Sequence, residues 1–155
     1  MRAVIQCVRK ADVSVNGGEA RAIGPGIVIL LGVKDTDTLD IVPKLAEKCA
    51  NLRVFPDEEG KLNKSAVDLG YSALVVSNFT LYGDCRKGKR PNFMAAGQPE
   101  AAQRLYEYFV RQCRERGAPV ETGHFGAHME IDMQADGPVT IWMDTDEMRK
   151  GQKRI

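Results

Sequence analysis

The chain has 155 residues, a length that suits one domain with a hydrophobic core of its own. Hydrophobic residues make up 43% of it and charged residues 28%, ordinary values for a globular protein, and no apolar stretch approaches the roughly 18 residues that a membrane span needs. The formal net charge of +1 excludes a polycation, and the first residues lack the long apolar core of a signal peptide, so the sequence predicts a cytoplasmic protein.

The beginning of the chain alternates apolar runs with turn signals. The runs predict strands over residues 2–8, 11–15 and 27–33. Turns are expected between them, at Asn16-Gly17-Gly18 and at Ile23-Gly24-Pro25-Gly26.

Helical spacing follows, because apolar residues recur at three- or four-residue steps from Ile41 to Leu52. Pro43 is tolerated only in the first turn of a helix, so the helix is expected to start near Asp40, which is a good N-cap residue. A short strand is expected at residues 54–55.

The rest of the chain predicts more strands and one long helix. These elements are a strand over 72–77, a polar loop over 84–98, a helix over 99–116, and strands over 120–122, 129–133 and 139–143. Several strands are joined by short turns without helical crossovers. The predicted fold class is therefore α/β, with a mostly antiparallel, barrel-like sheet and two main helices in one domain over residues 1–145, followed by a basic tail over 146–155.

The four cysteines are widely scattered, at positions 7, 49, 85 and 113. They form no CxxC pair and no zinc-finger spacing, so reduced structural thiols are expected. Cys85 lies in the polar loop beside Arg86 and Lys87, and a reactive thiol of low pKa is the alternative at that position.

The first candidate site segment is Ser77-Asn78-Phe79-Thr80-Leu81-Tyr82-Gly83, at the end of an apolar run. A strand that ends in this way leaves backbone N–H groups unpaired, and those of Phe79 and Thr80 are candidates to stabilise a developing oxyanion. The Thr80 hydroxyl is a weak nucleophile without a base. The alternative interpretation is an ordinary strand end with a satisfied hydroxyl.

The second candidate segment is Asp136-Gly137-Pro138-Val139-Thr140, before another apolar run. A Gly-Pro dipeptide in this position is most often a turn. In the functional interpretation, the backbone at Gly137 would approach a ligand closely, and its carbonyls would accept hydrogen bonds from an ammonium group. The sequence alone does not say whether the bond is cis.

Two clusters of basic residues stand out against the low net charge. Arg86, Lys87, Lys89 and Arg90 fall within five residues of the polar loop, and Arg149, Lys150, Lys153 and Arg154 fall in the tail. Such clusters predict local contact with phosphates. A solvated loop and a frayed terminus are the alternatives.

Together these segments resemble the D-aminoacyl-tRNA deacylase family. The family pattern is Ser-Gln-Phe-Thr-Leu with Gly-Pro-Val-Thr, and this chain has residues 77–81 and 137–140 in the corresponding places. The likeness extends over about 140 residues, with further matching segments at 1–6, 23–26, 31–33, 86–88, 90–91, 121–123 and 125–127.

The resemblance implies a hydrolase that needs no metal and no cofactor and that cleaves the ester between a D-amino acid, or mischarged glycine, and tRNA. It implies a homodimer in which Gly137-Pro138, with a cis bond, reaches into the partner's site, holds the α-ammonium and excludes L-substrates. Substrate-binding roles then fall on Ser77, Asn78 and Val139 as well, catalytic roles on Phe79 and Thr80, and tRNA contacts on residues 86–90. Neither a membrane nor DNA is implied as a partner.

The chain departs from the family pattern at two positions. Asn78 stands where the pattern has Gln, and Cys7 stands where the family usually has an Arg that helps to hold the Gly-Pro loop. These departures keep two alternatives open, a non-catalytic tRNA-binding relative and a deacylase with relaxed or shifted specificity.

Overall fold

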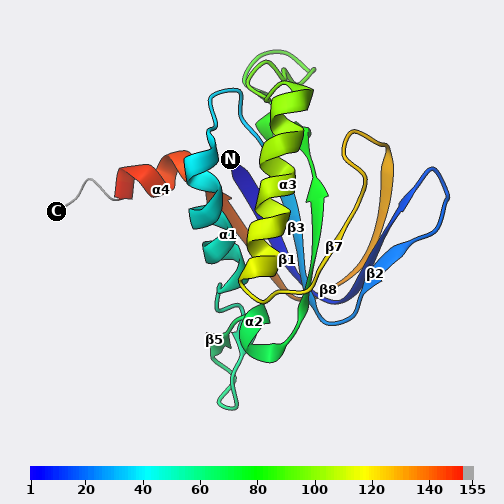
Figure 1. Cartoon of the computed structure of the whole chain (residues 1–155), viewed down its shortest axis with the longest axis vertical. Coiled ribbons are helices and arrows are strands. Elements are labelled where there is room, and N and C mark those ends of the chain that lie inside the picture. The colour runs from blue at the N-terminus through cyan, green and yellow to red at the C-terminus, as the bar shows by residue number, and fades with distance from the viewer. Residues whose placement is uncertain (152–155) are drawn as a thin grey trace.

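One bent β-sheet of six strands organises the molecule (Figure 1). A computed structural model describes residues 1–151 of the chain. The strands are β1 (Arg2–Val15), β2 (Arg21–Ile23), β3 (Gly26–Gly32), β4 (Phe55–Pro56), β5 (Leu62–Lys64), β6 (Ser72–Ser77), β7 (Val120–Thr122) and β8 (Met129–Asp144). The helices are α1 (Val42–Ala50), α2 (Ala66–Leu69), α3 (Pro99–Glu115) and α4 (Thr145–Gly151), with 3₁₀ turns η1 (Leu39–Ile41) and η2 (Phe79–Tyr82).

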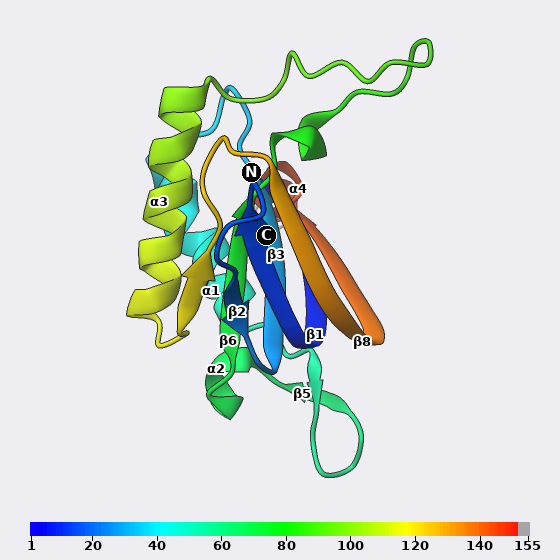
Figure 2. The ribbon, with the colours of Figure 1, turned by 90° about the vertical axis from the view of Figure 1, so that its right-hand side faces the viewer.

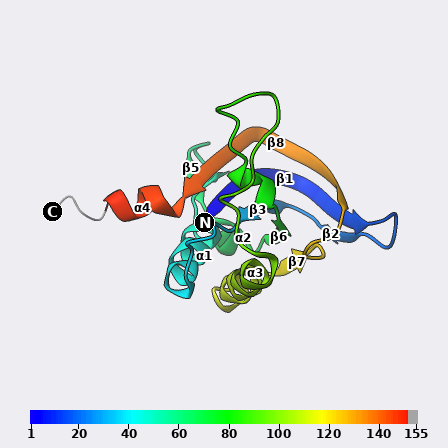
Figure 3. The same ribbon diagram turned by 90° about the horizontal axis from the view of Figure 1, so that it is seen from above.

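Strand β1 is the centre of the sheet, because it pairs antiparallel with β2, β3 and β8. Strand β6 lies parallel to both β3 and β7, and β4 and β5 form a separate two-stranded ribbon. Figure 3 shows β1 and β8 curving around together. The predicted α/β domain with a mostly antiparallel, barrel-like sheet is confirmed.

Helices α1 and α3 lie side by side on one face of the sheet (Figures 1 and 2). Their apolar faces pack on alternate residues of the central strands, and Leu45 of α1 and Phe109 of α3 are fully buried against Ile5, Ile29 and Val75. A second, smaller cluster of buried side chains is separate from this one. It consists of Val8, Ala11, Val13, Ile23, Val28, Leu74 and Val76.

Several predicted boundaries are corrected by the structure. The strands expected over 2–8 and 11–15 are one continuous strand, β1, and those over 129–133 and 139–143 are one continuous strand, β8. Because these two strands pair with each other on both sides of an irregularity near Cys7, non-local hydrogen bonds hold extended residues that local sequence suggests are turns.

The expected helix start at Asp40 is also corrected. A 3₁₀ turn occupies residues 39–41, the α-helix begins at Val42, and its N-cap is Ile41. The Asp40 carboxylate accepts a hydrogen bond from the Thr38 hydroxyl, and it makes no capping hydrogen bond to α1. Pro43 lies in the first turn of the helix, as predicted.

The first part of the basic tail is helical and docked. Helix α4 begins at the fully buried Thr145, and Lys34 binds Asp146 with an Nζ–Oδ2 distance of 2.8 Å. Lys153 and Arg154 lie outside the described residues. Among residues 1–151, no helix combines the length and apolar character needed to cross a bilayer.

The cysteines are all unpaired in the part of the chain that the structure describes. Cys7, Cys49 and Cys113 are buried and Cys85 is exposed. Burial raises the pKa of the Cys113 thiol to about 12, with the Arg116 charge opposing it, so this thiol stays protonated at neutral pH.

Candidate active site

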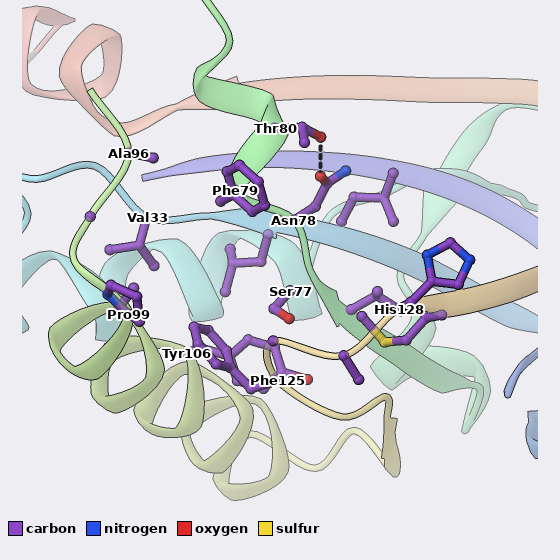
Figure 4. A pocket seen from close by; sticks show the side chains of 18 of the residues that line it. Val33, Ser77, Asn78, Phe79, Thr80, Ala96, Pro99, Tyr106, Phe125 and His128 are labelled. Atoms are coloured by element: carbon purple, nitrogen blue, oxygen red, sulfur yellow. Dashed lines mark hydrogen bonds between the residues drawn. The ribbon is translucent and has the colours of Figure 1, made fainter. Parts of the chain in front are cut away.

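A cavity of ≈ 700 Å³ opens between the end of β6, the start of α3 and the segment that leads into β8. Ser77, Asn78, Phe79 and Thr80 of the first candidate segment all line it. Figure 4 shows these residues on one side of the cavity, with Tyr106 and Phe125 on another. The structure therefore brings the first segment together as one wall of a single pocket.

The backbone of this wall presents two free amides. The Asn78 amide donates to the Leu31 carbonyl at 2.8 Å, and the chain then turns out of β6 into the 3₁₀ turn η2. The amides of Phe79 and Thr80 are the first two of that turn, and within residues 1–151 neither has a protein acceptor. Two N–H groups at the edge of a cavity can bind an oxyanion.

Side chains along this wall supply polar groups but no strong base. The Thr80 hydroxyl donates to the amide oxygen of Asn78 (Figure 4). A neutral amide oxygen does not remove a proton, so this bond orients the hydroxyl without activating it. Although Asn is one methylene shorter than Gln, position 78 retains a side-chain hydrogen bond.

The Arg2 side chain contacts η2 and holds it in place. Its Nη1 donates to the Leu81 carbonyl at 2.8 Å, and its Nε binds Asp144 at 3.0 Å. The guanidinium also lies 4.5 Å from the centroid of the Tyr82 ring. Burial raises the pKa of the Tyr82 hydroxyl, which has no partner within residues 1–151. Strand β1 thus holds the amide-bearing turn in place.

The second segment forms a bulge in β8. Gln6 of β1 pairs with Thr140 and Val8 pairs with Ala135, so residues 136–139 all lie opposite Cys7. The Gly137–Pro138 peptide is cis, and Gly137 has φ +120°. The turn interpretation of Gly-Pro was wrong, since the segment interrupts the pairing inside a continuous strand.

The two segments do not meet within one copy of the chain. Gly137, Pro138 and Val139 are exposed or half-buried, and of the described residues that line the cavity none belongs to this bulge. Thr140 is anchored, because its hydroxyl donates to the Gln6 side chain at 2.8 Å. The bulge therefore presents its backbone to the outside of the sheet.

Cys7 lies buried at the base of this bulge. Its Sγ donates to the Val54 carbonyl at 3.6 Å. Burial, with a smaller contribution from the Asp136 carboxylate, raises the pKa of the Cys7 thiol to about 11. A neutral thiol thus occupies the position at which the family pattern has a cationic side chain.

The basic cluster lies on an arm, residues 84–98, that extends from the body between η2 and α3 (Figure 2). Asp84 and Asn92 exchange two backbone hydrogen bonds of 2.7 and 2.9 Å that close its outer part. Hydrogen bonds from Arg86 lower the pKa of Asp84 to about 2, so these two charges neutralise each other. Lys87, Lys89 and Arg90 are exposed and pair with no carboxylate within residues 1–151.

The opposite wall of the cavity was missed by sequence reasoning. Tyr106, Phe125 and His128 line it, and the Tyr106 hydroxyl donates to the Val75 carbonyl at 2.8 Å. Tyr106 follows the buried stripe of α3, and helical spacing does not distinguish a core residue from a residue that lines a pocket.

Comparisons with known proteins identify the family of the chain. The family model described as D-Tyr-tRNA(Tyr) deacylase matches residues 4–144. A D-aminoacyl-tRNA deacylase of Thermus aquaticus is 56% identical over 147 residues, 95% of this chain and 97% of the relative. One of Chloroflexus aurantiacus is 55% identical over 149 residues, 96% and 93% of the two chains.

Solved structures show the same fold. One, described as c-Myc DNA Unwinding Element Binding Protein, superposes with a TM-score of 0.87 at 44% identity, over 93% of this chain and 98% of the other. A probable eukaryotic D-amino acid tRNA deacylase superposes with a TM-score of 0.80 at 18% identity, over 92% and 98%. The match to the family model over nearly the whole length, together with relatives above 50% identity, shows that this chain belongs to the D-Tyr-tRNA(Tyr) deacylase family, a family of hydrolases.

Proposed function

We propose that the chain hydrolyses the ester bond of D-aminoacyl-tRNA and releases the free D-amino acid and tRNA. The observation that carries this proposal is the pair of unpaired amides, at Phe79 and Thr80, on the wall of a cavity in a member of this family. A volume of ≈ 700 Å³ is within the range of pockets that hold small molecules, and it suits an aminoacyl group with its adenosine.

The chemistry needs little from side chains, because an aminoacyl ester is already activated. Positioning of the ester and stabilisation of the tetrahedral oxyanion by the Phe79 and Thr80 amides supply the rate. Water attacks the ester carbonyl with help from the neighbouring 2′-hydroxyl of the substrate, and the ester oxygen leaves with a proton. Ser77 and Asn78 line the same wall and contact the adenosine and the ester.

Selection against L-substrates is assigned to the bulge of a second copy. In the proposed homodimer, Gly137, Pro138 and Val139 of one copy enter the cavity of the other, where backbone carbonyls accept hydrogen bonds from the α-ammonium. The outward position of the bulge in a single copy supports this arrangement. Glycine passes the same filter because it has no side chain, so mischarged glycyl-tRNA is a second substrate.

The proposed setting is the cytoplasm, with Arg86, Lys87, Lys89 and Arg90 near tRNA phosphates.

The test is hydrolysis of D-tyrosyl-tRNA, L-tyrosyl-tRNA and glycyl-tRNA by the purified protein. We expect the D-ester and the glycyl ester to be cleaved at least about 100-fold faster than the L-ester, because a backbone filter rejects by steric exclusion. Equal rates for D and L would reveal a deacylase of relaxed specificity. Salt-dependent tRNA binding without any hydrolysis would identify the non-catalytic relative that the basic arm also allows.

The Thr80→Ala variant distinguishes catalysis assisted by the 2′-hydroxyl of the substrate from covalent catalysis by Thr80. We expect kcat/KM for D-tyrosyl-tRNA to fall by no more than about tenfold, because only the orienting bond to Asn78 is lost. Removal of a covalent nucleophile would instead cost on the order of 10⁶-fold. Thr80→Ser, which keeps the hydroxyl, is the matched control, and a collapse of activity in the alanine variant alone would make Thr80 the nucleophile.

A further inference from the structure

Three hollows that share lining residues, here called the track, follow one another from the arm to the active site. The outermost is lined by Asp84, Arg86, Lys87, Arg90 and Asn92. The middle one is lined by Asn92, Phe93, Met94, Ala96 and Gln98, and the innermost is the active-site cavity. Asn92 is shared by the first two, and Ala96 is shared by the middle hollow and the cavity. A basic surface thus lies next to an apolar one, which in turn lies next to the cavity.

The middle hollow exposes flat and polarizable side chains to solvent. Met94 is 83% exposed and Phe93 is 37% exposed, although both are apolar. Phe93 is also held in place: its ring meets that of Phe79, itself 59% exposed, edge-on with centroids 5.2 Å apart. A Cβ on Gly83 would lie 3.1 Å from the Phe93 ring, so the ring packs directly on that glycine. An exposed aromatic that is already ordered loses little conformational freedom on binding.

We propose that Phe93 and Met94, here called the stacking patch, bind the unpaired nucleotides that precede the terminal adenosine of tRNA. This inference rests on the proposed function, because it assumes that the terminal adenosine enters the cavity. Charge supports this occupant, since Lys87 and Arg90 of the outermost hollow are exposed cations that no carboxylate within residues 1–151 neutralises. A nucleic-acid strand alternates phosphates with apolar base faces, and the track offers matching groups in order from Lys87 and Arg90 to the stacking patch and the cavity.

The patch therefore contributes to affinity for the polynucleotide and not to the chemical step. Under this proposal, a substrate that ends at the adenosine does not reach Phe93 or Met94. The distinguishing experiment compares kcat/KM on D-tyrosyl-tRNA with kcat/KM on D-tyrosyl-adenosine, the same ester without the preceding nucleotides. The variants are Phe93→Leu, which keeps an apolar group on Gly83, Phe93→Tyr, which keeps a flat ring, and Met94→Ala.

We expect Phe93→Leu to lower kcat/KM on D-tyrosyl-tRNA by about tenfold, mainly through KM, and to leave D-tyrosyl-adenosine hydrolysis unchanged. Phe93→Tyr should retain wild-type values on both, and Met94→Ala should act like Phe93→Leu to a smaller extent. Leu62→Ala, which removes another exposed apolar side chain on the β4–β5 ribbon, is the matched control and should change neither value.

Three results would overturn the proposal. Equal losses on both substrates would place Phe93 in the cavity wall, no loss on either would leave the patch without a role, and a reduced dimer fraction in sedimentation would make it a contact between copies. A direct binding assay separates this proposal from the proposed function. A CCA trinucleotide with 2-aminopurine in the penultimate position should change fluorescence on binding, and Phe93→Leu should weaken that binding about fivefold or more, even in a protein that hydrolyses neither ester.

Discussion

Phe79→Pro should lower kcat/KM on D-tyrosyl-tRNA by about 100-fold or more relative to Phe79→Ala. Both variants lose the ring, but only proline lacks the backbone N–H that the proposed mechanism directs at the oxyanion. Phe79 is the first residue of η2, where proline is tolerated, and Asn78 before it has φ −147° and ψ 88°, outside the helical region that proline disfavours in the preceding residue. Steady-state kinetics of the two variants measures the contribution of one amide.

The alanine variant is the essential control in this comparison. It retains the amide and removes an exposed ring, so its stability should stay close to that of the wild type. Thermal unfolding of both variants checks that proline has not displaced η2. Similar kinetics for alanine and proline, with both proteins folded, would show that the Phe79 amide takes no part in the reaction.

Gly137→Ala should lower kcat/KM on D-tyrosyl-tRNA by about 100-fold, because displacement of a positioning group by about 1 Å has effects of this size. Gly137 has φ +120°, and an added Cβ would lie 2.8 Å from the Val139 amide nitrogen and 2.9 Å from its Cγ2. The bulge must shift to accept the methyl group. The measurement is hydrolysis of D- and L-tyrosyl-tRNA side by side, since a displaced filter also changes the ratio between them.

Gly60→Ala supplies the matched control for backbone strain. Gly60 also has a positive φ, +79°, but nothing lies within 4 Å of an added Cβ, and it belongs to the turn between β4 and β5. It should lower stability slightly and leave the kinetics unchanged. If Gly137→Ala behaves in the same way, residues 137–138 are not the filter.

The sequence pattern correctly predicted those elements whose structure depends on residues that are close together in the chain. The continuous apolar runs at 27–33 and 72–77 correspond to β3 and β6, and the helical spacing after Pro99 corresponds to α3. Residues 77–80 were predicted as one site and do line one cavity, because they follow each other at a strand end. In each case the decisive residues are neighbours in sequence.

The features that could not be predicted depend on residues far apart. The bulge at 136–139 exists because β8 keeps its pairing with β1 on both sides of Cys7, about 130 positions earlier in the chain. Likewise, Tyr106 resembles an ordinary core residue until β6 and the 125–131 segment are placed around it. A charge count identified the basic arm but not that Asp84 neutralises Arg86. Composition and spacing carry no information on such partners.

The positions of the two segments along strand β1 determine which mutations in two chains could complement each other in a dimer. Arg2 contacts η2 and Cys7 lies opposite the bulge, so the two positions of β1 that support these segments are five extended residues, roughly 17 Å, apart in the same copy. The ester carbonyl and the α-ammonium of one substrate are only a few ångströms apart, so under the proposed dimer each working site combines two chains. Two strongly impaired variants, Phe79→Pro and Gly137→Ala, would then complement each other. Random mixing would restore about a quarter of wild-type activity, because about half of the dimers are mixed and each of those has one intact site.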